Sequence, residues 1–490
     1  MLCARLTTKG VAVAERMLKF VNLAQEQPKK RPAGERSHDF GEIYREFDDR
    51  KAAAQSSRCS QCGVPFCSVH CPLSNNIPDW LKLTAEGRLE EAYEISSATN
   101  NFPEICGRIC PQDRLCEGNC VIEKGFEAVT IGSVERYITD TAFERGWVQP
   151  VRPRQELGAS VGIIGAGPGG LAAAEELRRH GYQVTVYDRH DRVGGLLIYG
   201  IPNFKLEKPV VLRRAALLED SGVRFELNCA VGRDITLGDL RARHDAVLIA
   251  TGVYKPRDIG APGSGLSGIV PALDYLIASN RAGLGDSVPA FESGVLDAQG
   301  KNVVVIGGGD TAMDCVRTAV RQGAASVKCL YRRDRENMPG SLREVKNAEE
   351  EGVEFVWLAA PEAFLGDECV AGVRAVRMHL GYPDSSGRQS VEPVEGSHFT
   401  LPADLVIKAL GFDPEDLPAM FDEPSLEVSG WGTLKINRRT FETSLPGVFA
   451  AGDIVRGASL VVWAIRDGRD AADQIHRHLL QHQTLALAAE

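Results

Sequence analysis

The sequence predicts an α/β fold in which a helical, cysteine-rich segment precedes two doubly wound units. Three observations predict it. Eight of the thirteen cysteines lie between residues 59 and 120. A strand, a glycine-rich turn, a helix and a second strand follow one another from Val161 to Tyr187, and the same succession recurs from Val303 to Tyr331. Strands that alternate with helices in this way form parallel sheets with helical layers.

Length and composition are those of an ordinary globular protein. With about 150 residues per domain as a guide, the 490 residues suffice for about three domains. The formal net charge of −10 argues against a general affinity for nucleic acid or anionic membranes. No apolar run reaches the roughly 18 residues that a membrane span requires, and the remaining cysteines are scattered singly, which suits a reducing compartment. We expect a cytoplasmic protein.

The N-terminal third reads mainly as helix. No periodic apolar face or motif marks the segment before Met17. We expect either an alternative start at Met17 or a loose tail before it. From Asp39 to Trp147 helices alternate with cysteine loops, and Trp80 to Ile95 has apolar residues near helical spacing. A linker follows at Pro150, Pro153 and Gly158. We therefore expect an N-terminal extension over 1–38 and a helical domain over 39–155.

The clustered cysteines form two groups of four: Cys59, Cys62, Cys67 and Cys71, then Cys106, Cys110, Cys116 and Cys120. Thiolates are soft ligands, and eight of them make two complete four-thiolate sites. Cys71 and Cys110 each precede a proline, as in the bacterial ferredoxin run. The pattern predicts two 4Fe–4S clusters.

Structural zinc and disulfides are the alternative roles for these cysteines. Four-cysteine zinc sites are common and often contain C-x2-C pairs, but the second group has no such pair. Disulfides would fit an oxidising compartment, but no apolar segment with a small-residue cleavage site opens the chain. We therefore favour iron–sulfur clusters over structural zinc, and zinc over disulfides.

The spacing also suggests how the ligands are shared. In the bacterial ferredoxin run the cysteine before the proline ligates the other cluster. In that run the exchanged cysteine stands at the end of an x3 gap, as Cys71 and Cys120 do at the ends of their groups. The geometry therefore suggests an exchange, with one cluster on Cys59, Cys62, Cys67 and Cys120, and another on Cys71, Cys106, Cys110 and Cys116. Uncrossed ligation within each group of four stays open as the alternative.

The first glycine-rich turn has G-x-G-x-x-G spacing at Gly165, Gly167 and Gly170. Gly165 permits the tight turn, Gly167 lets the backbone approach a pyrophosphate, and Gly170 lets helix and strand pack closely. The following helix presents N–H groups and the positive end of its dipole to the phosphates. The next strand ends on Asp188, which can accept hydrogen bonds from ribose hydroxyls. We expect NAD or FAD at this turn.

The second glycine-rich turn has Gly307 and Gly309, with Ala312 in the third position, which the motif allows. Asp310 and Thr311 complete the turn. Two such turns, each inside a strand–turn–helix–strand frame, are a much stronger signal than one glycine motif alone.

The strand after the second turn ends on Arg332 and Arg333 instead of an acid. Arginines at this place suit a ribose 2′-phosphate, through charge and bidentate hydrogen bonds. The alternative is that both arginines only cover a helix face, which the neighbouring Asp334 slightly favours. We expect NADPH at the second turn.

Further motifs resemble those of FAD-binding members of the two-dinucleotide flavoprotein group. The first turn extends to G-x-G-x-x-G-x3-A-x6-G, and other matching pairs are Gly194-Gly195, Thr251-Gly252 and Gly452-Asp453. The resemblance implies that the first turn binds FAD and that Asp453 contacts its ribityl and phosphate region. Because Asp453 lies beyond the second turn, it also implies insertion of the NADPH domain (299–399) into the FAD domain (156–298 and 400–490).

Longer stretches resemble the small (β) subunit of bacterial NADPH-dependent glutamate synthase. They include CGVPFCSVHCPLSNNIPDWLKL, GLLIYGIPNFKLEK, GGGDTAMDCVRTAVRQGA and YRRDRENMPGSLREVKNAEEEGVEF. Similarity covers nearly all of the chain after Met17, and the family's eight cysteines are present. By this resemblance Lys205 neighbours the isoalloxazine ring, although a surface lysine is the alternative.

The resemblance implies an electron relay. A hydride from NADPH reduces FAD, and single electrons leave through the clusters to a large (α) subunit that carries FMN and makes glutamate from 2-oxoglutarate and glutamine. A glutamine-hydrolysing amino-terminal cysteine would stand at position two, where this chain has Leu2, so we expect that chemistry in the partner of a hetero-oligomer. Two alternatives remain: a related NADPH-dependent reductase that serves another acceptor, and a zinc-stabilised nucleotide-binding scaffold without redox turnover.

Overall fold

The computed structural model describes residues 14–383 and 389–489, with side chains described to residue 481. The chain divides into two compact units. The first comprises Tyr44–Gln149 and the chain up to Lys30. The second comprises Arg31–Ile43 and the chain from Pro150 onward. The chain therefore passes into the second unit for thirteen residues and returns to the first before it crosses again.

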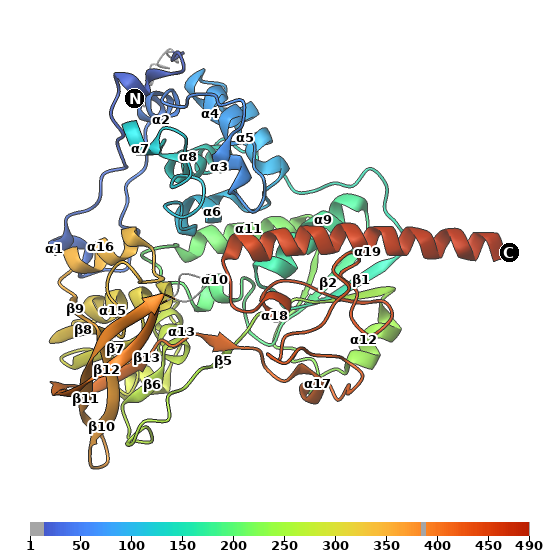
Figure 1. Cartoon of the computed structure of the whole chain (residues 1–490). Helices are drawn as coiled ribbons and strands as arrows, with labels where there is room; N and C mark the ends of the chain where they lie inside the picture. Colours follow the sequence, from blue (N-terminus) through green and yellow to red (C-terminus); the bar gives the residue numbers. More distant parts are fainter. Residues whose placement is uncertain (1–13, 384–388, 490) are drawn as a thin grey trace, which may run out of the picture. The chain divides into compact units, whose positions relative to one another are not determined.

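The first unit is helical (Figure 1). Its helices pack around Trp80, Leu81, Val134 and Ile138, all at most 1% exposed. The helices are η1 (Lys19–Val21), α2 (Asp49–Ser56), α3 (Phe66–Val69), α4 (Ile77–Ala85), α5 (Leu89–Ala98), α6 (Pro103–Ile109), α7 (Glu123–Phe126) and α8 (Ile131–Glu144).

The apolar spacing from Trp80 to Ile95 belongs to two helices, α4 and α5, and not to one. The break falls at Gly87, whose φ of +77° lies in the left-handed region that ends helices. Helix α4 begins with a proline in its first turn, where the missing N–H costs nothing. The prediction of helix with interrupting cysteine loops is confirmed.

The second unit contains two parallel five-stranded sheets. The first sheet has the order β15-β4-β1-β2-β3. Its strands are β1 (Ser160–Ile164), β2 (Gln183–Tyr187), β3 (Arg224–Glu226), β4 (Ala246–Ile249) and β15 (Val448–Ala450). The associated helices are α9 (Pro168–His180), α10 (Leu196–Tyr199), α11 (Lys208–Asp220), α12 (Leu237–Arg243), α17 (Leu417–Met420), α18 (Asp453–Arg456) and α19 (Val461–Ala489). Helices α9 and α19 lie side by side (Figure 1).

The second sheet has the order β6-β13-β7-β8-β9, and all of its strands lie in the chain between β4 and β15. The strands are β6 (Ile269–Pro271), β7 (Asn302–Ile306), β8 (Ser326–Tyr331), β9 (Glu354–Trp357) and β13 (Leu405–Lys408). Helices α13 (Ala272–Gly283), α14 (Pro289–Glu292), α15 (Asp310–Arg321) and α16 (Leu342–Glu350) accompany them. The prediction of two doubly wound domains, the second inserted into the first, is confirmed. The domain boundaries themselves stay a prediction, and β6 and β13 lie outside the expected range 299–399.

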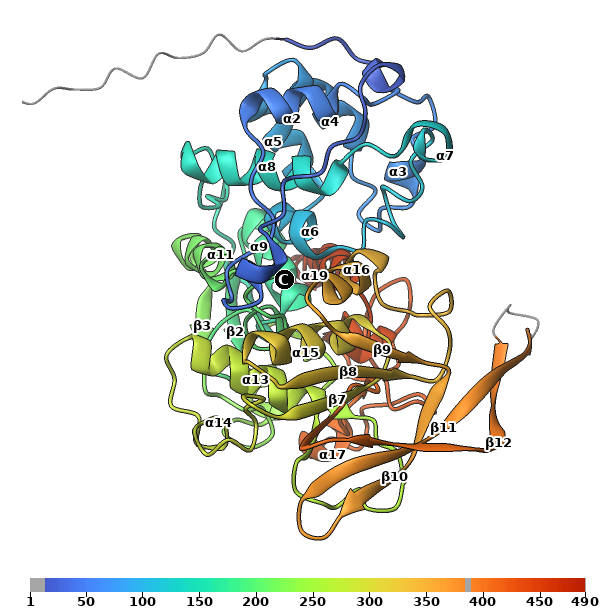
Figure 2. The ribbon, with the colours of Figure 1, turned by 90° about the vertical axis from the view of Figure 1, so that its left-hand side faces the viewer.

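A three-stranded antiparallel sheet, β10-β11-β12, separates β9 from β13 in the chain (Figure 2). Its strands are β10 (Ala359–Gly366), β11 (Val370–Pro383) and β12 (Gln389–Pro402). Val304 and Ile306 of β7 pack towards Val373 and Leu401 of this sheet. Alternate residues of a strand point to opposite faces, so the residues between them face the helices, where Val305 packs. The sequence pattern did not predict this layer.

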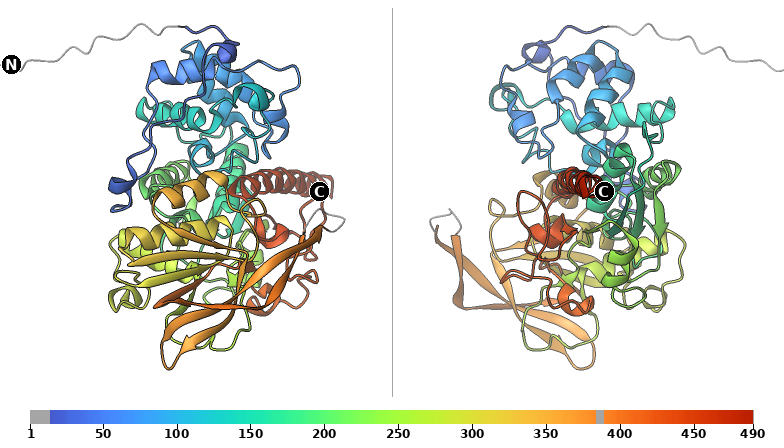
Figure 3. Two further views of the ribbon diagram at one scale, coloured as in Figure 1. Left: turned by 60° about the vertical axis from the view of Figure 1, so that its left-hand side comes forward. Right: turned by 90° about the vertical axis from the view of Figure 1, so that its right-hand side faces the viewer.

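A short antiparallel pair joins β5 (Lys255–Pro256) to β14 (Phe412–Asp413), where the chain leaves the first sheet and where it returns. Figure 3 shows the long strands of the three-stranded antiparallel sheet, in orange, from two further sides. Helix α1 (Ala33–Arg36) is also part of the second unit, although in the sequence it lies between the two segments of the helical unit.

Candidate cofactor sites

The first glycine-rich turn joins β1 to α9. At Gly165, φ is +111°, and a Cβ there would lie 2.4 Å from the carbonyl oxygen of Ala250. A Cβ at Gly170 would lie 2.0 Å from the Gly165 oxygen. By contrast, a Cβ at Gly167, the residue that caps α9, would meet no atom within 4 Å. Two of the glycines therefore close the turn, and the third leaves open space where backbone can meet a phosphate.

Asp188 follows β2 and is buried beside this turn. Its carboxylate accepts a hydrogen bond from the Ala166 backbone N–H at 2.7 Å. The other oxygen accepts from the His190 backbone N–H at 2.8 Å and lies 2.9 Å from the His190 ring Nδ1. The carboxylate thus ties the turn to the end of the second strand, which fixes its place beside the cavity described next.

Two adjoining cavities open at the carboxyl ends of the first sheet's strands, where ligands bind in doubly wound folds. Both are lined by Gly165, Asp188, Thr251 and Tyr254. One also has an apolar wall of Val231, Leu417, Met420 and Phe421. The other extends along Gly167, Leu196, Leu197, Gly252, Gly452, Asp453 and Val461. Of the residues expected at the first nucleotide, Gly165, Gly167, Asp188, Thr251, Gly252, Gly452 and Asp453 therefore line one continuous site.

Thr251 gives a direct sign that this site accommodates a polar ligand. Its hydroxyl oxygen is buried and has no hydrogen-bond partner within the described part of the chain. A buried hydroxyl left unpaired costs about 1–3 kcal/mol, so a ligand oxygen or nitrogen at this place is favoured. The residues fit a flavin dinucleotide: open glycine backbone for the pyrophosphate, an acid beside the ribose position and an apolar wall for adenine.

The remaining residues expected at the flavin support the same cavity. Gly195 has φ +54°, and a Cβ there would lie 2.9 Å from Gly167 Cα, so this residue packs directly on the phosphate turn. Its neighbour Gly194 has φ +127°. Asp453 accepts a hydrogen bond from the Ser459 hydroxyl at 2.6 Å. Burial raises the pKa of Asp453, which that hydrogen bond partly offsets.

The second glycine-rich turn joins β7 to α15 and repeats the geometry of the first. At Gly307, φ is +145°, and a Cβ would lie 2.2 Å from the Ala409 carbonyl oxygen. Gly309, which caps α15, again has open space at the Cβ position. Ala312 is fully buried in the second core. Asp310 accepts a hydrogen bond from the Ser341 N–H at 2.9 Å, which brings the chain before α16 over the turn.

Arg332 and Arg333 follow β8 directly. Arg332 is exposed. Arg333 is partly buried and donates from Nη2 to the Gln389 carbonyl oxygen at 3.1 Å, while its buried Nε has no partner among the described residues. Two guanidiniums therefore stand at the end of the second strand, the place that Asp188 occupies after β2. Thr311 is the second residue of α15, directly after Asp310.

Lys205 does not line the flavin cavity, and it is not a surface lysine. Its ammonium donates to Asp314 Oδ1 at 2.8 Å and lies 3.8 Å from Glu344. Burial alone would lower the pKa of Lys205, but these carboxylates outweigh it and raise the pKa. The residue joins the chain after α10 to helices α15 and α16. Its role beside the isoalloxazine stays a prediction.

The first-unit cysteines lie in two neighbourhoods. Burial raises the pKa of the Cys67 thiol to about 12, and the nearby Cys59 and Cys120 raise it further. Burial also raises the pKa of Cys59, and the neighbouring Cys120 and Cys62 act in the same direction.

The second neighbourhood contains the other four thiols. A hydrogen bond with Cys110 and burial raise the pKa of Cys106. Burial raises the pKa of Cys71 to about 11, with a smaller contribution from Cys106. Burial raises the pKa of Cys116, and Glu117, then Cys71, and least of all Cys67 of the first neighbourhood raise it further. Cys71 thus lies near Cys106 and Cys116 of the later group, and Cys120 lies near Cys59 and Cys67 of the earlier group. No three His, Cys, Asp or Glu side chains of the described chain are placed to hold a single metal ion.

Two residues without a sequence signal stand beside the second neighbourhood. Asn100 Oδ1 lies 3.8 Å from Cys106 Sγ, and its amide donates to Glu135 Oε1 at 3.2 Å. Burial raises the pKa of Glu135 to about 8. Glu135 lies in VTIGSVERYI, a stretch that resembles the glutamate synthase small subunit, but its spacing does not single out this residue, which only its position on helix α8 identifies.

The fold and these sites define a class: flavin-dependent reductases with two dinucleotide-binding domains. The family model described as pyridine nucleotide-disulphide oxidoreductase matches residues 159–468. The model described as dihydropyrimidine dehydrogenase domain II, 4Fe-4S cluster, matches residues 36–147. A solved structure, Mycobacterium tuberculosis FprA in complex with NADPH, shares the fold at a TM-score of 0.57 and 22% identity, over 68% of this chain and 86% of that one.

Closer relatives identify the family. The glutamate synthase (NADPH) small chain of Azospirillum brasilense is 71% identical over 95% of this chain and 96% of its own length. The putative oxidoreductase AegA of Escherichia coli K12 is 46% identical over 92% of this chain but 69% of its own length. The chain belongs to the family of NADPH-dependent glutamate synthase small chains.

The prediction of an NADPH-dependent oxidoreductase that uses FAD and 4Fe–4S clusters is confirmed. Structural zinc and the scaffold without redox turnover are therefore set aside. The described helices include none with the length and apolar character of a membrane span.

Proposed function

We propose that this chain is the electron-input subunit of a glutamate synthase. With all groups bound, a hydride from NADPH reduces FAD, and 4Fe–4S clusters carry single electrons to an FMN-containing large subunit that makes glutamate from 2-oxoglutarate and glutamine. The observation that carries the proposal is the 71% identity to a named small chain over almost the whole of both proteins. We infer a cytoplasmic hetero-oligomer.

The chain's own contribution is binding and orientation. We assign the flavin to the cavity at the carboxyl ends of the first sheet's strands, held by Gly165, Gly167, Gly170, Asp188, Gly194, Gly195, Thr251, Gly252, Gly452 and Asp453. We assign NADPH to the second turn, held by Gly307, Gly309, Asp310, Thr311, Ala312, Arg332 and Arg333. The difference between Asp188 and the arginine pair supports the assignment of FAD to the first turn and NADPH to the second, because an acid repels a 2′-phosphate that guanidiniums attract.

We further propose crossed ligation of two clusters. One uses Cys59, Cys62, Cys67 and Cys120, and the other uses Cys71, Cys106, Cys110 and Cys116. The electrostatic coupling of Cys59 and Cys67 to Cys120, and of Cys116 to Cys71, supports this grouping. Cys59→Ser and Cys120→Ser should damage the same EPR signal, and Cys71→Ser the other. If Cys120→Ser and Cys106→Ser alter one common signal instead, ligation is uncrossed.

The partner is tested by reconstitution. Purified chain should bind a glutamate synthase large subunit and support NADPH oxidation that depends on glutamine and 2-oxoglutarate. The chain alone, with an artificial acceptor, controls for intact flavin reduction. Intact reduction of the flavin without complex formation and without stimulated oxidation would refute the glutamate synthase assignment.

The second candidate is a related reductase module that serves another acceptor. AegA supports it, because a segment similar to this chain there forms part of a longer oxidoreductase. The same reconstitution decides between the two: turnover with another acceptor protein, and none with the large subunit, favours the second candidate.

A further inference from the structure

One segment of the second unit lies, in the sequence, between the two segments of the helical unit. Arg31–Ile43, which we call the strap, lies between Lys30 and Tyr44 of the first unit but belongs to the second. Arg36, at the end of its short helix α1, is only 1% exposed. A buried guanidinium is tolerated only where carboxylates and hydrogen bonds offset its lost hydration.

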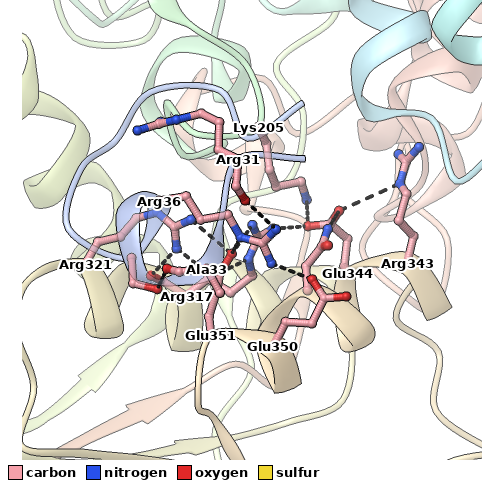
Figure 4. Close-up of polar contacts among 12 residues, drawn as sticks. Arg31, Ala33, Arg36, Lys205, Arg317, Arg321, Arg343, Glu344, Glu350 and Glu351 are labelled. Carbon is pink, nitrogen blue, oxygen red and sulfur yellow. Dashed lines mark hydrogen bonds and ion pairs between the residues drawn. The ribbon is translucent and has the colours of Figure 1, made fainter. Parts of the chain in front are cut away.

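Arg36 finds those carboxylates at the end of helix α16 (Figure 4). Its Nε donates to Glu351 Oε1 at 2.9 Å, and its Nη2 donates to Glu350 Oε2 at 2.7 Å. Its third nitrogen, Nη1, donates to the carbonyl oxygen of Arg31 at 3.3 Å. The strap is therefore attached to the second sheet's helical layer by a buried ion pair.

The same Glu351 carboxylate binds helix α15. Arg317 donates to both of its oxygens at 2.9 Å, and Arg321 donates at 2.7 and 3.1 Å. Arg317 also donates to Glu344 at 2.5 Å. One fully buried carboxylate thus joins the strap to two arginines of α15 (Figure 4).

Helix α15 is also held from the first sheet's side, by the loop 203–207. Lys205 binds Asp314 of α15 at 2.8 Å. The ring of Phe204 packs against the guanidiniums of Arg321 and Arg317, whose Cζ atoms lie 3.9 and 4.5 Å from its centre. Such cation–π contacts strengthen when they are desolvated.

The strap binds this loop as well. The Asn203 amide donates to the Phe40 carbonyl oxygen at 2.8 Å, and the Glu42 N–H donates to Glu207 Oε1 at 3.1 Å. The rings of Phe40 and Phe204 lie 6.3 Å apart. The strap therefore contacts both partners of the α15–loop contact.

Both partners continue into the proposed cofactor sites. Helix α15 begins at Asp310, directly after Gly309 of the NADPH turn. The loop follows α10, whose Leu196 and Leu197 line the flavin cavity. A shift of α15 against the loop would move the two sites relative to each other.

We propose that the strap clamps helix α15 against loop 203–207, and that Arg36 is a positioning residue for hydride transfer. The proposal rests on the two cofactor sites assigned above. In the step, a hydride leaves NADPH, which becomes NADP+, and its two electrons and hydrogen pass to FAD. Such transfer needs reacting atoms about 3–3.5 Å apart, and a misplacement of about 1 Å can cost about 100-fold in rate.

Arg36→Met tests the clamp. The variant should fold, because Glu351 keeps Arg317 and Arg321, and Glu350 is about one-third exposed and can be hydrated. Flavin reduction by saturating NADPH, followed by anaerobic stopped-flow absorbance, should slow at least tenfold. FAD content and the Kd for NADP+ should stay within about twofold. Hydrogen exchange of strap peptides and of the start of α15 should be faster.

Three further variants keep the test decisive. Asn203→Ala removes the strap–loop hydrogen bond to Phe40, and the bond that Asn203 accepts from the Lys208 N–H, without touching the ion cluster. It should slow flavin reduction in the same direction if Arg36→Met does not fold. Arg36→Lys should recover part of the rate, and Arg335→Met, which loses only an exposed pair with Glu349, should match the wild type.

The outcomes separate clearly. Unchanged flavin reduction in Arg36→Met with faster exchange in the strap would overturn the clamp. Loss of FAD and NADP+ binding in parallel with the rate would overturn it too, since that result indicates a merely structural role. Since the large subunit is not needed for this assay, failure of the glutamate synthase assignment would leave the result intact. If NADPH does not reduce the wild-type flavin, the proposed function itself fails.

Discussion

The two dinucleotide-binding turns share one backbone design and differ in what surrounds it. Both have a positive-φ glycine packed against a neighbouring strand end, and both have an open glycine that caps the following helix. They differ at the third small position, which is Gly170 in the first and Ala312 in the second. They differ again at the strand end, where Asp188 is replaced by an arginine pair.

The helices that follow the turns are also covered differently. Helix α9 packs on α19 with glycines at the contact: a Cβ at Gly468 would lie 2.1 Å from the Gly169 oxygen. Helix α15 instead carries two buried arginines, Arg317 and Arg321, which pair with the buried carboxylate of Glu351. We therefore propose that the shared frame fixes where phosphate binds, and that side chains outside it set which nucleotide binds and how the domain is held.

Substitution at the third small position should have the strongest effect. Gly170→Ala would place a Cβ 2.0 Å from the Gly165 carbonyl oxygen, so the turn and α9 cannot keep their packing. We expect the purified variant to lose its FAD, measured as the flavin-to-protein ratio, and to unfold at a lower temperature.

The second turn supplies the matched control. Ala312→Gly removes a methyl group at the corresponding position and should cost only about 1 kcal/mol in helix propensity, with FAD retained. Full flavin content in Gly170→Ala would show that the close contact relaxes. It would contradict the proposal that the first turn requires glycine at this position while the second accepts alanine.

The next effect concerns the buried ion cluster of Glu351 with Arg317 and Arg321 of α15. Burial alone would raise the pKa of Glu351, but hydrogen bonds from Arg321 and Arg317 lower it to about 2. Because this folded-state pKa lies below the ordinary value of 4.5, the carboxylate stabilises the fold above about pH 4.5, and that stabilisation is lost as the pH falls towards 2.

Glu351→Gln should therefore lower the free energy of unfolding by about 3–5 kcal/mol at pH 7, since it leaves buried arginines without their shared anion. The difference from the wild type should shrink below about pH 4.5, in urea unfolding followed by circular dichroism. Glu156→Gln, which loses a largely exposed partner of Arg178, is the control and should cost at most about 1 kcal/mol. A difference for Glu351→Gln that stays constant with pH would contradict the assigned pKa.

The sequence predicts the parts of the molecule that depend on local spacing. Both turns and Asp188 follow from glycine positions and strand patterns. Thr251, Gly252, Gly452 and Asp453, which also line the proposed flavin cavity, and the insertion of the second domain are expected from the family resemblance. The α4–α5 break was missed because the apolar spacing continues across Gly87, whose positive φ ends the helix. The antiparallel sheet was missed because β12 exposes most of its side chains and has no clear apolar alternation.

Long-range ion pairs have no local signal at all. Arg36 and Glu351 are 315 residues apart, and Lys205 and Asp314 are 109 apart. Lys205 is expected beside the flavin from the family resemblance alone, and spacing gives no sign of the bond that its side chain makes to Asp314 of α15. Such pairs depend on how the inserted domain lies against the first, which spacing within a motif does not encode.

The weakest of these effects is the most specific test of how the two turns differ. If Arg332 and Arg333 bind the 2′-phosphate, each contributes a charge-assisted hydrogen bond of about 1.5–3 kcal/mol. Arg332→Ala and Arg333→Ala should each lower kcat/KM for NADPH about 10- to 150-fold and leave the much lower kcat/KM for NADH nearly unchanged.

The two arginines should not behave alike, because their surroundings differ. Arg333 already donates to the Gln389 carbonyl oxygen, so its removal also loosens the start of β12, whereas Arg332 is exposed. Arg332→Ala should therefore affect NADPH alone, and Arg333→Ala should in addition lower thermal stability. Arg335→Ala in the same loop controls for general loss of charge. If Arg332→Ala lowers kcat/KM equally for NADPH and NADH, Arg332 does not select the 2′-phosphate. The contrast with Asp188 would then not explain which nucleotide binds at each turn.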